Sequence, residues 1–151
     1  MATSFGIIGV GAFGELAAQH LAPHFDLVLH DAHRDLLPVV NSYGGRIGNL
    51  VEAASCDILM LAIPIQRFEQ VLTDIAPVVK ADAIVIDVAS IKSKPIELMQ
   101  DILPPTVQII GTHPLFGPQS GKDGIEGLNI VICPLRGNLS LIHISEPTRP
   151  Y

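Results

Sequence analysis

The sequence predicts an α/β protein with a doubly wound, mainly parallel sheet and helices on both faces. Two observations lead to this expectation. Short runs rich in Ile and Val alternate along the chain with amphipathic segments of helical length, which is typical of parallel strands buried beneath helices. A glycine-rich turn also follows the first apolar run and opens the first amphipathic segment, as it does at the first turn of many doubly wound sheets.

Strands and helices are expected in alternation up to about residue 133. The apolar, β-branched runs predict six strands, namely Ser4–Gly9, Asp26–His30, Asp57–Ala62, Ala83–Asp87, Val107–Gly111 and Asn129–Cys133, with a further short strand at Arg46–Ile47. The amphipathic segments predict helices at Ala12–Leu21, Asp35–Tyr43, Leu50–Ala54, Gln66–Val79 and Pro95–Ile102. Glycine follows the second helix at Gly44, where a helix often ends, and Pro95 suits the first turn of the last helix.

The size and composition are those of one globular domain, which we expect to span residues 1–137. The chain has 151 residues, 48% of them hydrophobic and 16% charged, and that is enough to sustain a single core. Its net charge of −6 argues against a nucleic-acid partner, because such proteins carry a basic face. It contains neither an apolar run of membrane-spanning length nor a signal peptide at its start, so we expect no membrane partner and a cytoplasmic location.

The segment 138–151 does not continue the strand–helix pattern. It has no helical stripe, and it resembles translated sequencing-adapter sequence. We expect it to be a non-native tail, with a natural tail as the alternative, and we leave it out of the functional interpretation.

The glycine-rich turn predicts a dinucleotide site. Its residues match the pattern G-x-G-x-x-G and are Gly9, Val10, Gly11, Ala12, Phe13 and Gly14. The first glycine permits the tight turn, the second lets the backbone approach a pyrophosphate, and the third lets the helix pack closely on the strand. The pyrophosphate then lies at the helix N-terminus, where free N–H groups favour negative charge. Since the motif follows a strand and opens a helix, we expect a Rossmann-like fold.

Asp31 bears on the choice of cofactor. It stands 22 residues after Gly9 and directly follows the second predicted strand, where an acidic residue binds the adenosine ribose. A carboxylate accepts a hydrogen bond from a ribose 2′-hydroxyl but repels a 2′-phosphate, so NAD is favoured over NADP. The neighbouring His33 and Arg34 could meet that phosphate, so NADP stays possible.

Two further stretches follow predicted strands, where open α/β sheets place their chemistry. One is Asp87–Lys92, with the pattern D-V-x-S-x-K, and the other is Gly111–Gly124, which contains the block His113–Pro118. With these motifs and the glycine turn, the chain resembles the prephenate and arogenate dehydrogenase family from about Phe5 to Pro134. Residues 120–124, Ser-Gly-Lys-Asp-Gly, resemble plant-type arogenate enzymes most closely.

This resemblance implies a reaction and two catalytic residues. The family oxidises the ring hydroxyl of prephenate or arogenate, transfers hydride to the nicotinamide and releases the ring carboxylate. By the motif, His113 would be the catalytic base that takes the hydroxyl proton, for which a neutral imidazole is suited. Ser90 matches the family's active-site serine, which helps to align the histidine, the hydroxyl and the nicotinamide. From spacing alone, a histidine before proline is more often only a loop residue, and Ser90 could merely cap a turn.

Two polar residues after the histidine block are candidate substrate contacts. Many family members carry a carboxylate at the position of Gln119, so a pocket gated by that charge is not expected here. Asp123 supplies an acid four residues later and would favour the ammonium group of arogenate if it pointed into the pocket. The sequence leaves the choice between prephenate and arogenate open.

The resemblance also implies parts beyond this chain. Family members dimerise through a following helical domain, absent here, which completes the substrate pocket. We therefore expect the parent enzyme to be a homodimer and this chain alone to turn over substrate poorly. Alternatives are another Rossmann-type dehydrogenase, acting on 3-hydroxyacids or imines, and a non-catalytic NAD-sensing module. No metal is expected, because Pro23 interrupts the helix between His20 and His24 and no carboxylate or cysteine completes a ligand set.

Overall fold

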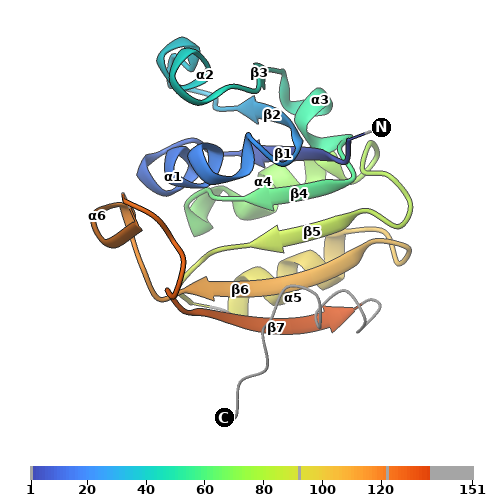
Figure 1. Cartoon of the computed structure of the whole chain (residues 1–151). Coiled ribbons are helices and arrows are strands. Elements are labelled where there is room, and N and C mark those ends of the chain that lie inside the picture. Colours follow the sequence, from blue (N-terminus) through green and yellow to red (C-terminus); the bar gives the residue numbers. More distant parts are fainter. Residues whose placement is uncertain (1, 92, 122, 137–151) are drawn as a thin grey trace.

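The protein is a seven-stranded sheet with helices on both faces (Figure 1), and the computed structural model describes residues 2–91, 93–121 and 123–136. The predicted tail 138–151 lies outside these residues. The strand order is β3-β2-β1-β4-β5-β6-β7. All neighbouring pairs are parallel except β6 and β7. The strands are β1 (Ser4–Ile8), β2 (Asp26–His30), β3 (Arg46–Ile47), β4 (Ile58–Leu61), β5 (Ile84–Asp87), β6 (Gln108–Pro114) and β7 (Ile130–Arg136).

The helices divide between the two faces of the sheet. They are α1 (Ala12–Leu21), α2 (Leu37–Tyr43), α3 (Leu50–Ala54), α4 (Ile65–Ile75), α5 (Ser93–Ile102) and α6 (Pro118–Gly121). Figure 1 shows α1 in front of the strands and α4 and α5 behind them. No helix in the described part of the chain has the length and apolar character needed to cross a membrane. The predicted doubly wound, Rossmann-like fold class is confirmed.

Two apolar clusters form the core, one on each side of the sheet. The larger joins α3, α4 and α5 to the strands through fully buried side chains such as Phe68, Leu72 and Met99. The smaller joins α1 and α2 to β1 and β2 and includes Ile7 and Leu29. Removal of this apolar surface from water is the main contribution to the stability of such a sheet.

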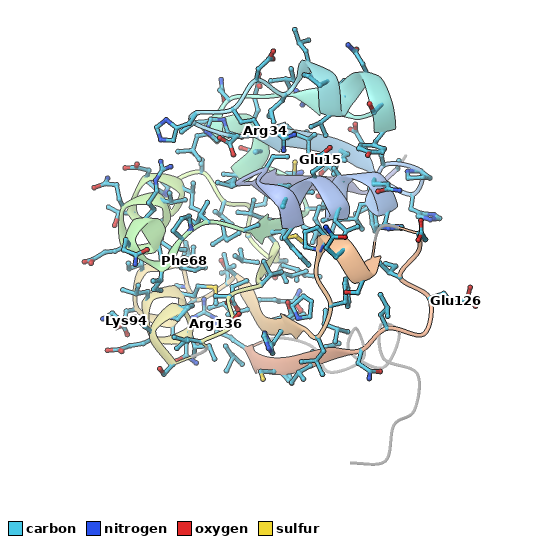
Figure 2. All side chains as sticks on the ribbon, turned by 90° about the vertical axis from the view of Figure 1, so that its left-hand side faces the viewer. Glu15, Arg34, Phe68, Lys94, Glu126 and Arg136 are labelled. Atoms are coloured by element: carbon cyan, nitrogen blue, oxygen red, sulfur yellow. The ribbon has the colours of Figure 1, made fainter. Side chains whose placement is uncertain are left out.

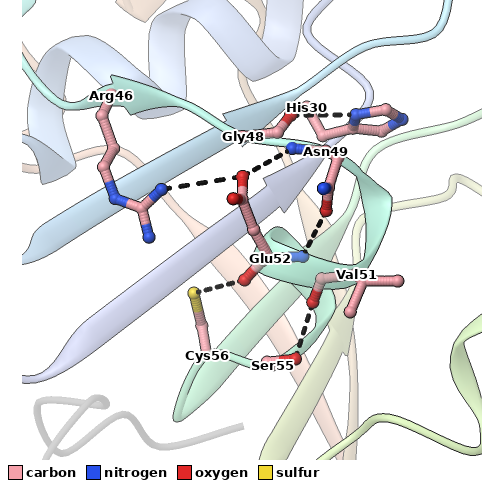
Figure 3. Close-up of polar contacts among 8 residues, drawn as sticks. All are labelled: His30, Arg46, Gly48, Asn49, Val51, Glu52, Ser55 and Cys56. Atoms are coloured by element: carbon pink, nitrogen blue, oxygen red, sulfur yellow. Dashed lines mark hydrogen bonds and ion pairs between the residues drawn. The ribbon is translucent and has the colours of Figure 1, made fainter.

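The short helix α3 forms because its first turn is capped (Figure 3). Asn49 accepts a hydrogen bond from the Glu52 backbone N–H at 2.8 Å, and the Glu52 carboxylate accepts one from the Asn49 N–H at 2.8 Å. This reciprocal capping box satisfies two N–H groups that a helix start leaves free. A side chain at Gly6 of β1 would overlap the carbonyl group of Ala53, so the capped helix lies directly against the strand.

Most predicted elements are confirmed, and the differences have local causes. Helix α4 ends at Ile75 rather than at Val79, because Pro77 lacks an N–H and restricts the residue before it. Strand β1 ends at Ile8 rather than at Gly9, since Gly9 has φ 95°. The prediction that β6 ends at Gly111 is wrong, because pairing with antiparallel β7 continues to Pro114.

Candidate functional site

Each of the three glycines in the turn after β1 occupies a different structural environment. Gly9 has φ 95°, a conformation that other residues rarely adopt, and its N–H donates to the His30 carbonyl at 2.9 Å. A side chain at Gly14 would overlap the Gly9 carbonyl oxygen, so Gly14 lets α1 pack on the turn. Gly11 has nothing within 4 Å of the position of a side chain. Protein packing therefore does not require this glycine, whereas a ligand that approaches the backbone would.

A cavity of about 460 Å³ opens beside this turn. Its walls combine the turn with the segments that follow β2 and β4, and its volume is in the range of small-molecule sites. Of the predicted cofactor residues, those that line it are Gly9, Gly11, Ala12, Phe13, Gly14 and Asp31. Val10 does not line the cavity, because its side chain is fully buried in the core. Arg67 of α4 also lines the cavity, and no sequence motif pointed to it.

Asp31 organises the loops at the end of β2. One of its carboxylate oxygens accepts the Val10 N–H at 2.8 Å, and the other accepts the N–H groups of His33 and Arg34, each at 2.9 Å. Burial raises the pKa of this carboxyl group, but the three N–H groups outweigh it, so the pKa lies below its ordinary value. The carboxylate is charged and faces the cavity, as a ribose-binding acid requires.

Glu15, which sequence reasoning did not select for the site, joins this arrangement through Arg34, which the sequence suggested only as a contact for a 2′-phosphate. The Arg34 guanidinium donates to the Val10 carbonyl at 2.7 Å and to the Glu15 carboxylate at 2.7 Å. Glu15 belongs to the first turn of α1, and Figure 2 shows the two side chains close together at the edge where β1 and β2 end. Their separation of 19 residues matches no local motif, so the sequence contained no signal for this pair.

Ser90 follows the end of β5, and His113 lies near the end of the neighbouring strand β6. The register pairs Asp87 of β5 with Gly111 of β6, and Thr112 fastens the two strands by donating its hydroxyl to the Asp87 carbonyl at 2.7 Å. His113 lies within β6 and pairs with Val131 of β7, so its prediction as a loop residue is wrong. Its Nδ1 atom is buried and has no hydrogen-bond partner among the described residues. Ser90 is exposed.

The segment after His113 packs on α1. Phe116 meets Phe13 of the glycine turn with ring centroids 6.1 Å apart. His20 of α1 lies 3.3 Å from the Gly121 carbonyl oxygen, which accepts a hydrogen bond when the ring nitrogen carries the proton. Together with apolar side chains of β4 to β7, Phe13 and Phe116 border a second, mainly apolar cavity of about 600 Å³. The aromatic pair therefore connects the glycine turn to the His113 segment.

The two predicted substrate contacts are both at the surface. Gln119 lies in the short helix α6, which the sequence analysis did not predict, and Asp123 follows it. Neither residue borders either of the two cavities. Within the parts of the chain that the structure describes, no group of three or more His, Cys, Asp or Glu side chains could hold a metal ion.

Comparisons with known proteins place these features in context. Residues 44–138 match the family model described as prephenate dehydrogenase, nucleotide-binding domain. Arogenate dehydrogenase 2, chloroplastic, from Arabidopsis thaliana is 32% identical over 141 residues, which are 89% of this chain and 39% of that protein. Arogenate dehydrogenase from Synechocystis has a TM-score of 0.76 at 25% identity, over 94% of this chain and 54% of that chain. This chain therefore spans only part of these relatives.

A further solved structure is similar in fold. Prephenate dehydrogenase from Aquifex aeolicus, in complex with hydroxyphenyl propionate and NAD+, has a TM-score of 0.71 at 20% identity, covering 96% of this chain and 55% of that one. At this identity the likeness concerns the architecture of the sheet and its helices.

Proposed function

Because this chain belongs to the family of prephenate dehydrogenase nucleotide-binding domains, we propose that it is the cofactor-binding part of an enzyme that oxidises prephenate or arogenate with NAD. Residues 1–137 would form this domain in the cytoplasm. The parent enzyme would be a homodimer joined through a helical domain that follows. The observation that carries the proposal is the glycine turn, whose open position at Gly11 and facing carboxylate at Asp31 fit a dinucleotide.

The fit rests on three properties of the groove. Gly11 leaves space where a pyrophosphate would approach the backbone. The start of α1 presents N–H groups there, which favour a negative charge. At the other end, the charged Asp31 favours a ribose 2′-hydroxyl and disfavours a 2′-phosphate. These properties support NAD as the preferred cofactor, with NADP as the alternative.

The chemistry proposed for the chain's own residues involves proton transfer and positioning. A bound nicotinamide cofactor supplies the hydride acceptor for the oxidation. The His113 imidazole would accept the proton of the substrate's ring hydroxyl as hydride leaves the carbon that bears it, and the ring carboxylate is lost as CO2. Ser90 would hold that hydroxyl in line by a hydrogen bond. The placement of Ser90 after β5 and of His113 near the end of the adjacent strand β6, and the free Nδ1 of His113 among the described residues, support these roles.

The decisive experiment replaces His113 in a protein extended to the length of the relatives. His113→Gln should lower kcat for prephenate or arogenate by about 10²- to 10⁴-fold, the range for loss of a general base, while NAD+ binding stays unchanged. His24→Gln is the matched control, since His24 is an exposed histidine beyond α1. Nearly full activity of His113→Gln would contradict the catalytic role.

The same protein separates the competing functions. Turnover of prephenate or arogenate supports the proposal and rules out a purely regulatory NAD-sensing module. Turnover restricted to 3-hydroxyacids or imines would instead assign the chain to another class of Rossmann-type dehydrogenase. Substrate contacts through Gln119 and Asp123 remain part of the proposal, and an unchanged ratio of arogenate to prephenate turnover in Asp123→Asn would remove Asp123 from it.

A further inference from the structure

The loop after β2 holds the backbone of Val10 at both its N–H and its carbonyl group. Its N–H donates to the Asp31 carboxylate at 2.8 Å, and its carbonyl oxygen accepts the Arg34 guanidinium at 2.7 Å. Val10 itself is fully buried. The residue between the first two glycines of the turn is therefore fixed by one acidic and one basic side chain that stand three residues apart.

Glu15 makes one polar side-chain contact among the described residues, and that contact is with Arg34. The Arg34 Nη2 atom and the Glu15 carboxylate oxygen lie 2.7 Å apart, and the side chains are 36% and 35% exposed. Figure 2 shows both at the carboxyl edge of the sheet. Because the pair is partly in water, it contributes little to folding stability. Neither side chain lines the cavity itself, but Arg34 also donates its backbone N–H to Asp31 at 2.9 Å, so the pair lies next to the Asp31 end of the cavity.

The three charged side chains connected around Val10 do not balance one another. Asp31 and Glu15 are negative and Arg34 is positive, so this group alone has a net charge of −1, while the cation of Arg67 lies on α4, where it also borders the cavity. A neutral 2′-hydroxyl is compatible with this charge. A 2′-phosphate brings about two further negative charges and would have to displace Glu15 before Arg34 could bind it in a bidentate manner.

We propose that Glu15 is a specificity-determining residue that keeps the groove selective for NAD by neutralising Arg34 and holding it against the glycine turn. The inference rests on the proposed function, because it assumes that the groove binds a dinucleotide. A substitution at Asp31 alters the acceptor of three backbone hydrogen bonds. Glu15 can be changed with loss of one surface contact, and the Arg34 guanidinium would then be available to a 2′-phosphate.

The test measures binding of NAD+ and of NADP+ to the purified chain by calorimetry. Glu15→Gln should shift the ratio of the two dissociation constants about fivefold towards NADP+, the size expected for removal of one partly exposed charge. The shift should come mainly from tighter NADP+ binding and should shrink at high salt. Glu97→Gln, which removes the same charge from the exposed side of α5, should leave the ratio unchanged.

A second variant tests whether Glu15 acts through Arg34. In an Arg34→Gln background, Glu15→Gln should shift the ratio less than twofold, because the cation that it releases is no longer present. A full shift in that background would overturn the inference. Thermal unfolding of each variant establishes that the fold is intact.

The remaining outcomes separate the inference from the proposed function. If NAD+ and NADP+ bind to the wild type but Glu15→Gln leaves their ratio unchanged, the specificity role of Glu15 is wrong and dinucleotide binding stands. If neither binds to the wild type, both the dinucleotide site and the inference are overturned.

Discussion

The loops after β1 and β2 and the segments after β5 and β6 meet at the same edge of the sheet, but they are held in different ways. On the first side, Asp31 and Arg34 fix the Val10 peptide by hydrogen bonds of 2.8 and 2.7 Å. On the second side, the segment after His113 rests on α1 through the Phe13–Phe116 ring contact and the approach of His20 to the Gly121 carbonyl oxygen at 3.3 Å. The buried Nδ1 of His113 has no partner in the part of the chain that the structure describes.

We infer from this difference that the two sides of the site tolerate amino-acid substitutions to different degrees. The backbone of the glycine turn is fixed by hydrogen bonds to charged side chains and by close packing against the Gly9 carbonyl group. It cannot shift without loss of those hydrogen bonds. A segment held by contacts between rings and flexible aliphatic side chains can adjust by small movements. We therefore expect substitutions on the glycine-turn side to have larger effects than comparable substitutions on the His113 side.

The largest difference is expected for a pair of glycine substitutions. Gly14→Ala places a side chain on the backbone carbonyl of Gly9, which cannot yield, whereas in Gly121→Ala it lies 2.8 Å from the end of the Leu16 side chain, which can. The free energy of unfolding should fall by roughly 2–3 kcal/mol for Gly14→Ala and by less than about 1 kcal/mol for Gly121→Ala. Urea unfolding measures both values, and equal losses would break the comparison.

A second pair separates binding from stability. Gly11 and Gly117 both have open space where a side chain would be placed, so Gly11→Val and Gly117→Val should fold. Only Gly11 lines the cavity of the glycine turn, so Gly11→Val should weaken NAD+ binding by at least about tenfold, or about 1.4 kcal/mol. Calorimetry with NAD+ provides the measurement. Equal affinities for the two variants would place the dinucleotide elsewhere.

The aromatic contact between the two sides should have a smaller effect. The Phe13 and Phe116 rings are tilted by 38° with centroids 6.1 Å apart, a geometry in which such pairs contribute about 0.5–1.5 kcal/mol. A double-mutant cycle with Phe13→Leu and Phe116→Leu, followed by urea unfolding, should give a coupling energy near the lower end of that range. A coupling energy of zero would mean that the two sides are stabilised independently.

The smallest effect is expected from pH. The folded pKa of Asp31 lies below its ordinary value, which for an unfolded aspartate is about 3.9. The stability that this carboxylate contributes is therefore present above that pH and is lost as the pH falls towards the lower folded pKa. Asp31→Asn should lower the melting temperature slightly near neutrality, and the difference from the wild type should decrease in acid. A difference that is constant with pH would contradict this role.

Local rules explain why much of the glycine-turn side could be predicted from the sequence. The requirements at Gly9 and Gly14 come from a turn and a helix that are adjacent in the chain, and Asp31 was located by its place after β2. The Glu15–Arg34 pair could not be predicted, because it depends on how α1 is oriented towards the loop after β2. The extension of β6 to His113 also escaped prediction, since it depends on the distant strand β7.

The double attachment of the Val10 peptide has a consequence for the evolution and engineering of cofactor preference. A change at residue 31 alters the charge of the groove and the shape of its turn together, so each such step carries a risk to folding. Residue 15 lies on the helix and leaves both attachments of Val10 in place. Natural or engineered substitutions on α1 could therefore change the preference between NAD and NADP while the glycine turn keeps its geometry.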